Sequence, residues 1–398
     1  MNTQICKWLI SLSVFLCLTF AASSAVAKKP APPPPPPDPV SDGAVCADSG
    51  SFFPAFMYVE IRNDDEIYLS NAAGDCSISV YKADWNISGI PTHLSYRFYG
   101  DSFSGHGVIV WSEQERDDDY VPLPSKIQML RFTITDGAIE ESLPISPTLL
   151  LQQIPRVGSM YAPDLSPEGD RVIFAGNEND DLNYYIDEMR VDCAPDCRTR
   201  LFETRPDANG DNVSIHQPLY GLDGQRIYFE LGYPNRKLVF IEKDKTGVWP
   251  ALDYASSADG TTTSESVLIL AHEDGSLGVG GIGYWDYDDD GFAEEVIAHP
   301  RSFLDYHTIE ILDVEACVAN EGGCNVAMYG EDIMIEGRSP SFTTFTDDPP
   351  DLLYTYLASK TSGVALRALD LDNLSERTLI NAIKGANSPF IGGVDSAD

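Results

Sequence analysis

A short segment recurs along this chain, and its repetition limits the fold more than any other feature of the sequence. The fullest copy is residues 162–176, APDLSPEGDRVIFAG. Pro163 and Asp164 enter a turn, residues 166–169 reverse the chain, and residues 171–174 alternate as a strand. A unit of this size cannot bury its own apolar side chains, so it must stack on copies of itself.

Two weaker copies follow. One surrounds Pro218 (QPLYGLDGQRIYFEL) and keeps an Asp223-Gly224 turn, and the other surrounds Pro340 (SPSFTTFTDDPPDLLYTYL) without that turn. Near the start, residues 66–75 (EIYLSNAAGD) read as a strand followed by an Asn-Ala-x-Gly turn.

These segments resemble the WD-like repeat of TolB-type β-propellers, which runs approximately Pro-x-hydrophobic-Ser-Pro-Asp-Gly-x-x-hydrophobic-x-Phe. Pro163, Ser166, Pro167, Gly169, Ile173 and Phe174 match it, with Glu168 in place of the usual Asp. The resemblance implies a propeller fold and the binding of protein partners, and it implies no catalytic residues.

The rest of the sequence is typical of an all-β protein. Nine segments are short, rich in β-branched or aromatic residues and bounded by Gly, Pro, Asp or Asn. They are residues 77–82, 107–111, 127–133, 171–174, 226–231, 237–241, 266–271, 307–312 and 352–357. Residues 373–384 are the best helix candidate.

The spacing of the copies predicts six four-stranded antiparallel blades, with five or seven as alternatives. Pro163 and Pro218 lie 55 residues apart, and Pro218 and Pro340 lie 122 apart, which is close to two steps. A degenerate blade is therefore expected near residues 264–326, two blades before Met160, and a last blade from Ser339.

The N-terminal region is predicted to direct export. Residues 1–27 have a basic Lys7, an apolar run over 9–20 and an Ala-x-Ala end, as in a cleaved secretory signal; an uncleaved anchor is the alternative. Residues 28–40, with six consecutive prolines, predict a polyproline II linker or a docking segment. The propeller should occupy residues 41–398, with no membrane span after cleavage, in the periplasm or outside the cell.

The charge excludes some partners. The chain has 26 Lys+Arg against 62 Asp+Glu, a net charge of −36. A surface of this sign repels nucleic acid and anionic membranes and attracts cations.

Six cysteines remain after the signal, which suits disulfides in an oxidising compartment. The close spacings favour Cys193–Cys197 and Cys317–Cys324, leaving Cys46–Cys76 to tie the entering segment to the first blade. Half of a metal site is the rival interpretation of Cys193 and Cys197, but no second pair completes a tetrahedral set.

One segment predicts a calcium site. Asp286, Asp288, Asp290 and Glu294 occupy positions 1, 3, 5 and 9 of a loop with Gly291 at position 6 and the carbonyl of Phe292 at position 7. The segment resembles the Asp-x-Asp-x-Asp-Gly calcium loops of extracellular β-rich families. Position 12 is Ile297 rather than Glu, so weak affinity is expected; a solvated acidic turn is the alternative.

Three functions remain in competition. The first is a non-catalytic module of the bacterial envelope that binds a protein or peptide. The second is a hydrolase or lactonase with a calcium-dependent site in the propeller channel. The third is a purely structural accessory of the envelope. Gly100-Asp101-Ser102 is the start of one esterase motif, but no alternating strand–helix pattern surrounds it. The first function is therefore favoured, with no catalytic residue assigned.

Overall fold

The fold was analysed in a computed structural model. It describes residues 56–60, 66–83, 90–100, 104–114, 125–152, 160–178, 183–194, 197–204, 214–232, 236–250, 254–255, 266–272, 279–288, 290–303, 306–320, 324–329, 341–343, 351–359, 363–383 and 391–393. The chain divides into units 1–38 and 39–398, and only the second contains described residues. The expected signal, the linker and Cys46 lie outside them.

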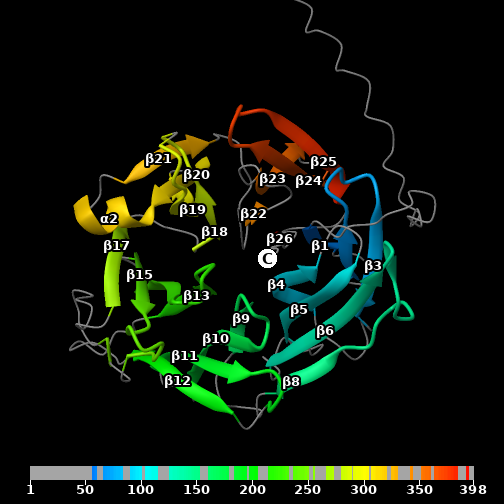
Figure 1. Ribbon diagram of the computed structural model, residues 1–398, viewed down its shortest axis with the longest axis horizontal. Coiled ribbons are helices and arrows are strands. Elements are labelled where there is room, and N and C mark those ends of the chain that lie inside the picture. Colours follow the sequence, from blue (N-terminus) through cyan, green and yellow to red (C-terminus); the bar gives the residue numbers. More distant parts are fainter. Residues whose placement is uncertain are drawn as a thin grey trace, which may run out of the picture. The chain divides into compact units, whose positions relative to one another are not determined.

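The described residues of the second unit form a six-bladed β-propeller (Figure 1). Each blade is an antiparallel sheet that runs outward from the centre of the ring, and the blades are numbered here in chain order. Blade 1 contains, from inside to outside, β26 (Ile391–Gly393), β1 (Phe56–Glu60), β2 (Glu66–Ser70) and β3 (Ser77–Lys82). Blade 2 contains β4 (Ile90–Gly100), β5 (Gly105–Gln114) and β6 (Ser125–Thr135), with β7 (Ala138–Ile139) and β8 (Thr148–Gln152) both paired to β6.

The remaining blades follow the same meander. Blade 3 contains β9 (Met160–Leu165), β10 (Arg171–Glu178), β11 (Asn183–Arg190) and β12 (Arg198–Thr204), with β16 (Tyr254–Ala255) added parallel to β12. Blade 4 contains β13 (Ile215–Tyr220), β14 (Arg226–Leu231), β15 (Arg236–Glu242) and β17 (Ser266–His272). Blade 5 contains β18 (Gly281–Trp285), β19 (Glu294–Phe303), β20 (Tyr306–Asp313) and β21 (Asn325–Tyr329). Blade 6 contains β22 (Ser341–Thr343), β23 (Asp351–Ser359), β24 (Gly363–Asp370) and β25 (Glu376–Ile383).

The ring is closed by strands from distant parts of the sequence, because β26 pairs with β1 through Phe56 and Tyr58. Among the described residues, one apolar cluster lies between each pair of neighbouring blades. Strand β10 shows why its sequence is continuously apolar: Val172 and Phe174 pack toward blade 2, while Ile173 and Ala175 pack toward blade 4. Burial of both faces replaces the alternation expected of a half-exposed strand.

The spacing within the repeat follows from a β-bulge that recurs in the innermost strands. In blade 3, Ala162 and Pro163 lie opposite the single residue Phe174. In blade 4, Gln217 and Pro218 lie opposite Phe229 in the same way. Two residues opposing one define a bulge, which bends the strand and requires an unusual backbone conformation. The proline and the phenylalanine of the repeat are therefore partners across it.

Blade 2 has the same bulge without the proline, since His93 and Leu94 lie opposite Trp111. The first residue of each pair has a positive φ: 57° at His93, 55° at Ala162 and 49° at Gln217. Trp111, Phe174 and Phe229 are fully buried, and each packs toward the preceding blade.

The two strongest copies also share a turn. Gly169 N–H donates to the Ser166 carbonyl at 2.9 Å, and Gly224 N–H donates to the Gly221 carbonyl at 2.9 Å. Both glycines have φ of 67°, a left-handed conformation that residues with a Cβ rarely adopt. Residues 171–175 and 226–230 occupy equivalent second strands of neighbouring blades, and all nine predicted strand segments lie in strands.

Two expectations about blade organisation were wrong. Residues 376–383 form β25 rather than a helix, because pairing with β24 and burial of Leu379 override the local preference. Blade 5 begins with β18 at Gly281, not near Ser264, because residues after β15 lengthen blade 4. A short helix, α2 (Val314–Asn320), follows β20, and Asp313 Oδ1 accepts the Ala316 N–H at its start at 2.8 Å.

Within the described ranges, no helix combines the length and the apolar character that crossing a membrane would require.

Candidate functional site

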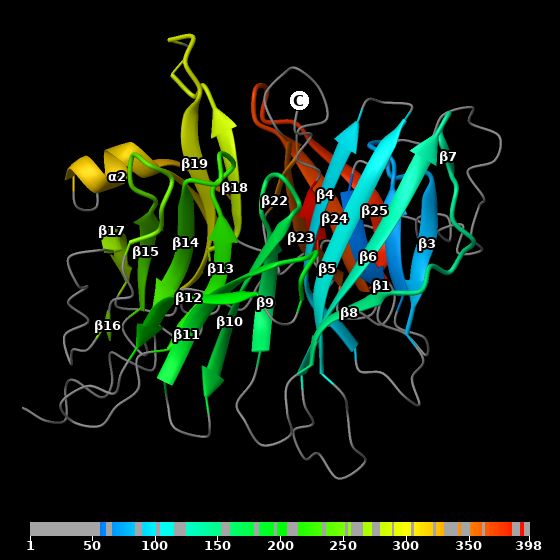
Figure 2. The same cartoon turned by 60° about the horizontal axis from the view of Figure 1, so that its bottom comes forward.

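The acidic loop identified in the sequence connects β18 to β19. Figure 2 shows this hairpin rising above the other blades. The carboxylates of Asp286, Asp288 and Glu294 each offer an oxygen, and these oxygens lie within 4.8 Å of one another. The structure thus brings together three of the four predicted carboxylates as a candidate metal site.

The backbone of the loop is shaped by its own aspartates. Asp286 accepts the N–H groups of Asp290 (3.1 Å) and Gly291 (2.9 Å), and Asp288 also accepts the Asp290 N–H, at 3.2 Å. Asp290 is not part of the converging group, and its carboxylate accepts the Phe292 N–H at 2.9 Å. The Phe292 side chain is 75% exposed, so only its carbonyl could act as the predicted ligand.

Glu294 has the least favourable environment in this loop. Burial raises the pKa of its carboxyl group, and the nearby charges of Asp288, Asp290 and Asp286 raise it further. Its Oε2 is buried and accepts no hydrogen bond in the described part of the chain. Carboxylates that repel each other in this way are stabilised when a cation lies between them.

The structure contains two of the expected disulfides, Cys193–Cys197 and Cys317–Cys324. Cys76 is also disulfide-bonded, while Cys46, its expected partner, lies outside the described residues. Asp101 and Ser102 of the esterase-like segment lie outside them as well.

The structure also contains a pocket that the sequence did not reveal. It has a volume of about 590 Å³ and lies between blades 3 and 4. Its walls are the β9–β10 turn, parts of β11, β12 and β13, and residues 243–250, which we call the strap. The strap follows β15 of blade 4, yet Trp249 packs on the cluster between the two blades and β16 then pairs with β12 of blade 3.

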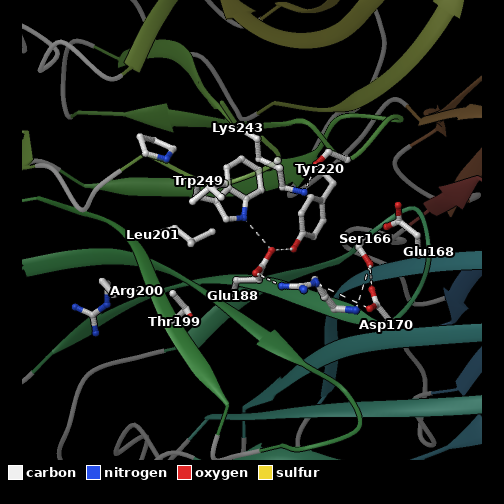
Figure 3. Close-up of a pocket in the computed structure, with 15 residues that line it drawn as sticks. Ser166, Glu168, Asp170, Glu188, Thr199, Arg200, Leu201, Tyr220, Lys243 and Trp249 are labelled. Carbon is white, nitrogen blue, oxygen red and sulfur yellow. Dashed lines mark hydrogen bonds and ion pairs between the residues drawn. The ribbon is translucent and has the colours of Figure 1, made fainter. Parts of the chain in front are cut away.

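Glu188 occupies the centre of this pocket (Figure 3). It is 5% exposed, and three side chains donate to its carboxylate: Arg171 Nη1 at 2.6 Å, Tyr220 Oη at 2.8 Å and Trp249 Nε1 at 3.1 Å. A buried carboxylate is tolerated when donors of this kind satisfy it. Because the donors come from β10, β13 and the strap, Glu188 holds the three walls in position.

Tyr220 is unsuited to proton transfer at neutral pH. Burial raises the pKa of its hydroxyl well above the ordinary value, and the adjacent Glu188 carboxylate raises it further. The hydroxyl therefore stays protonated and serves as a hydrogen-bond donor.

The remaining charged side chains of the pocket come from separate elements (Figure 3). Glu168 and Asp170 are exposed on the β9–β10 turn. Lys243 Nζ donates to the Gly224 carbonyl at 2.7 Å and lies 4.7 Å from the centre of the Trp249 ring. Arg200 lies on the far side of the pocket from Glu168 and Asp170 (Figure 3), where it is paired with Asp187 and Glu203.

Asp164, the second residue of the repeat, connects the blades around this pocket. Its carboxylate accepts the Ser95 hydroxyl of blade 2 at 2.6 Å and the Tyr220 N–H of blade 4 at 2.8 Å. Burial raises the pKa of the Asp164 carboxyl group, although Arg97 and these hydrogen bonds act in the opposite direction.

Sequence reasoning missed this pocket because its residues come from separate elements. Two local signals were present: Asp187-Glu188 inside an otherwise apolar strand, and Trp249 in a segment bounded by Gly247 and Pro250. Neither signal predicts that Trp249 meets Glu188, because the strap leaves blade 4 and packs against blade 3.

No protein-family model and no curated protein matches this sequence. Among solved structures, the chain is similar to an oligogalacturonate lyase in complex with manganese, with 14% identity and a TM-score of 0.35, over 73% of this chain and 74% of the lyase. It is also similar to a prolyl endopeptidase, with 9% identity and a TM-score of 0.39, over 81% of this chain but only 39% of the endopeptidase. A third similar structure is TolB from Agrobacterium tumefaciens, with 16% identity and a TM-score of 0.30, over 83% of this chain and 79% of that one. At these identities, the likeness concerns the fold alone.

Proposed function

We propose that this chain is an exported β-propeller of the TolB type, which binds a protein or peptide partner in the bacterial envelope without catalysing a reaction on it. The observation that supports this most is the pocket between blades 3 and 4. It is large enough to take several side chains of a partner, and its central carboxylate already accepts three hydrogen bonds.

The state of the titratable groups in the pocket favours binding over catalysis. A general base needs an acceptor that is free to take a proton, whereas Glu188 is engaged by three donors. A general acid needs a pKa near the working pH, whereas the pKa of Tyr220 is raised far above it. Trp249 and the aliphatic side chain of Val248, which is 59% exposed, offer instead the mixed surface that suits a peptide.

We further propose that the acidic loop of blade 5 binds calcium. Asp286, Asp288 and Glu294 supply oxygen ligands, as calcium prefers, and the Phe292 carbonyl and Asp290 complete the predicted set. A bound cation would relieve the repulsion that raises the pKa of Glu294 and would fix the hairpin above the ring.

The periplasm or the extracellular medium is the compartment that fits the disulfides and the proposed calcium site. Disulfides persist in oxidising compartments, and the chain contains two in the described region. Extracellular calcium is also concentrated enough to fill a weak site.

The test of binding is a selection of random heptapeptides against the full chain exported from a Gram-negative host. Selected peptides are titrated by calorimetry against the wild type and Trp249→Ala. We expect Trp249→Ala to weaken binding at least about tenfold, equivalent to about 1.4 kcal/mol. Leu374→Ala, an exposed apolar truncation on blade 6, should leave the affinity unchanged.

Two outcomes would contradict the proposed function. One is the absence of any peptide that binds saturably. The other is turnover of a panel of esters and lactones that is lost on adding a chelator and restored by calcium.

A further inference from the structure

We infer that the pocket between blades 3 and 4 recognises a carboxylate of its peptide partner, and that Lys243 is the residue that binds it. This inference rests on the proposed peptide-binding function and adds the chemistry that selects the ligand.

The first argument is the charge balance around Lys243. In the described part of the chain, Lys243 makes no ion pair with a carboxylate; its ammonium group donates to the carbonyl of Gly224. The sequence contains 62 acidic residues and 26 basic ones, so most lysines should have an acid available. An unmatched ammonium group at a pocket wall leaves a positive site in a negative protein.

The acids nearest to Lys243 in sequence are engaged elsewhere. Glu242 pairs with Arg226 on the neighbouring strand at 3.3 Å. Asp244 turns into the strap, where its carboxylate accepts the N–H groups of Thr246 (2.8 Å) and Val248 (3.0 Å) and the Thr246 hydroxyl (2.6 Å). The Asp244 bonds fix the strap conformation, and within the described residues neither carboxylate forms an ion pair with the Lys243 ammonium group.

The other cations of the pocket have partners of their own. Arg171 is paired with Glu188, and Arg200 with Asp187 and Glu203. Among the described residues that line the pocket, Lys243 is thus the cation that makes no ion pair, and a carboxylate that enters the pocket can pair with it. Electrostatic complementarity of this kind sets the choice of partner.

The surroundings of Lys243 make such a contact selective. Its ammonium group lies 4.7 Å from the centre of the Trp249 ring, an arrangement that holds a cation in place. Trp249 is in turn fixed by its hydrogen bond to Glu188. The ligand carboxylate would thus meet a pre-positioned donor beside an aromatic surface that takes the adjoining apolar part of the peptide.

The experiment uses the peptides selected above. Each peptide with an Asp or Glu is compared with its Asn or Gln analogue, and each is made with a free and an amidated C-terminus. These arms distinguish a side-chain carboxylate from a chain end. They are titrated against the wild type, Lys243→Met, Lys243→Arg and the matched control Lys245→Met, which removes the same charge from an exposed site two residues away.

We expect Lys243→Met to weaken the carboxylate peptide at least about tenfold and its amide analogue less than about twofold, because a charged hydrogen bond contributes roughly that factor. Lys243→Arg should restore much of the affinity, and Lys245→Met should have little effect. Equal binding of carboxylate and amide peptides by the wild type would overturn the inference while leaving peptide binding intact. Equal losses in Lys243→Met and Lys245→Met would overturn it too. Absence of peptide binding would remove both proposals.

Discussion

Acidic side chains of blade 3 and of blade 5 lie in opposite surroundings. The carboxylate of Glu188 in blade 3 accepts hydrogen bonds from side chains of three elements, one of which is the charged Arg171. In blade 5, Asp286, Asp288 and Glu294 converge on one another, and Asp286 and Asp288 accept hydrogen bonds from backbone N–H groups of the same loop. The first carboxylate is satisfied by donors within the chain, and the second group is a candidate site for a cation from outside. The difference shows that carboxylates in one fold can be paired with side-chain donors from several elements, or can converge on one another within a single loop.

The largest loss of stability is expected when Glu188, whose carboxylate accepts three side-chain hydrogen bonds, is removed. Glu188→Ala leaves the Tyr220 hydroxyl and the Trp249 N–H without their acceptor, and each buried unpaired donor costs roughly 1–3 kcal/mol. We therefore expect the free energy of unfolding in urea to fall by about 3 kcal/mol or more. Glu188→Gln, which keeps an acceptor oxygen, should cost clearly less. A loss below about 1 kcal/mol in Glu188→Ala would mean that the carboxylate does not hold the pocket together.

The next largest effect is the response of stability to calcium, which tests the converging carboxylates of the acidic loop in blade 5. Calcium should raise the free energy of unfolding by RT ln(1 + [Ca²⁺]/Kd), which is about 2.7 kcal/mol at a free concentration about 100-fold above Kd. For a chain of this size, the melting temperature should rise by only a few degrees. Magnesium should do less, because it prefers a tighter octahedral shell.

The positions of the carboxylates in the loop determine which variants serve as controls for the calcium experiment. Asp288→Asn combined with Asp290→Asn should abolish the response. Glu294→Gln should impair it more than Asp290→Asn alone, because Glu294 belongs to the converging group and Asp290 does not. If differential scanning fluorimetry shows no shift in the wild type at millimolar calcium, the loop is an acidic turn only.

A smaller and pH-dependent effect is expected at Asp164. Its pKa is raised in the folded protein, chiefly by burial, so the folded state keeps this proton to a higher pH than the unfolded chain. Its contribution to the free energy of unfolding should therefore decrease as the pH rises above the ordinary Asp value of about 3.9, by at most about 1.4 kcal/mol per pH unit.

The measurement compares the wild type with Asp164→Asn, which does not titrate, by urea unfolding from pH 4 to pH 7. The stability of the wild type relative to the variant should decline over this range. Asp170→Asn, at an exposed aspartate of the same turn, corrects for surface charge. A relative stability that increases with pH would contradict the expected direction of the pKa shift.

Much of the fold could be predicted from the sequence, because the repeat carries its own geometry. Pro163 and Phe174 are eleven positions apart since they oppose each other across the bulge, and Pro218 and Phe229 repeat the relation. Blade 2 was harder to recognise because His93 and Leu94 form the same bulge without proline. The start of blade 5 was misplaced because the inserted strap disturbs the regular spacing.

The candidate sites differ in the same way. The acidic loop is local, so the spacing of Asp286, Asp288 and Glu294 was enough to predict their convergence. The pocket around Glu188 depends on a segment of blade 4 that packs on blade 3, and this is a tertiary relation. Sequence patterns report contacts between neighbours along the chain, and they do not report which loop crosses to another blade.

The smallest effect is expected at Phe292, and it separates the main chain of the acidic loop from its side chains. The Phe292 ring is 75% exposed, and a Cβ placed at the adjacent Gly291 would meet nothing within 4 Å, so the loop is open around both positions. Phe292→Ala should therefore change the free energy of unfolding by less than about 0.5 kcal/mol. The carbonyl at position 292 belongs to the backbone and survives the substitution, so the melting shift with calcium should also persist. If Phe292→Ala instead abolishes the calcium response, the ring must fold over the loop when the cation binds. The comparison with blade 3 would then change, because calcium binding by the acidic loop of blade 5 would depend on an aromatic side chain as well as on its carboxylates.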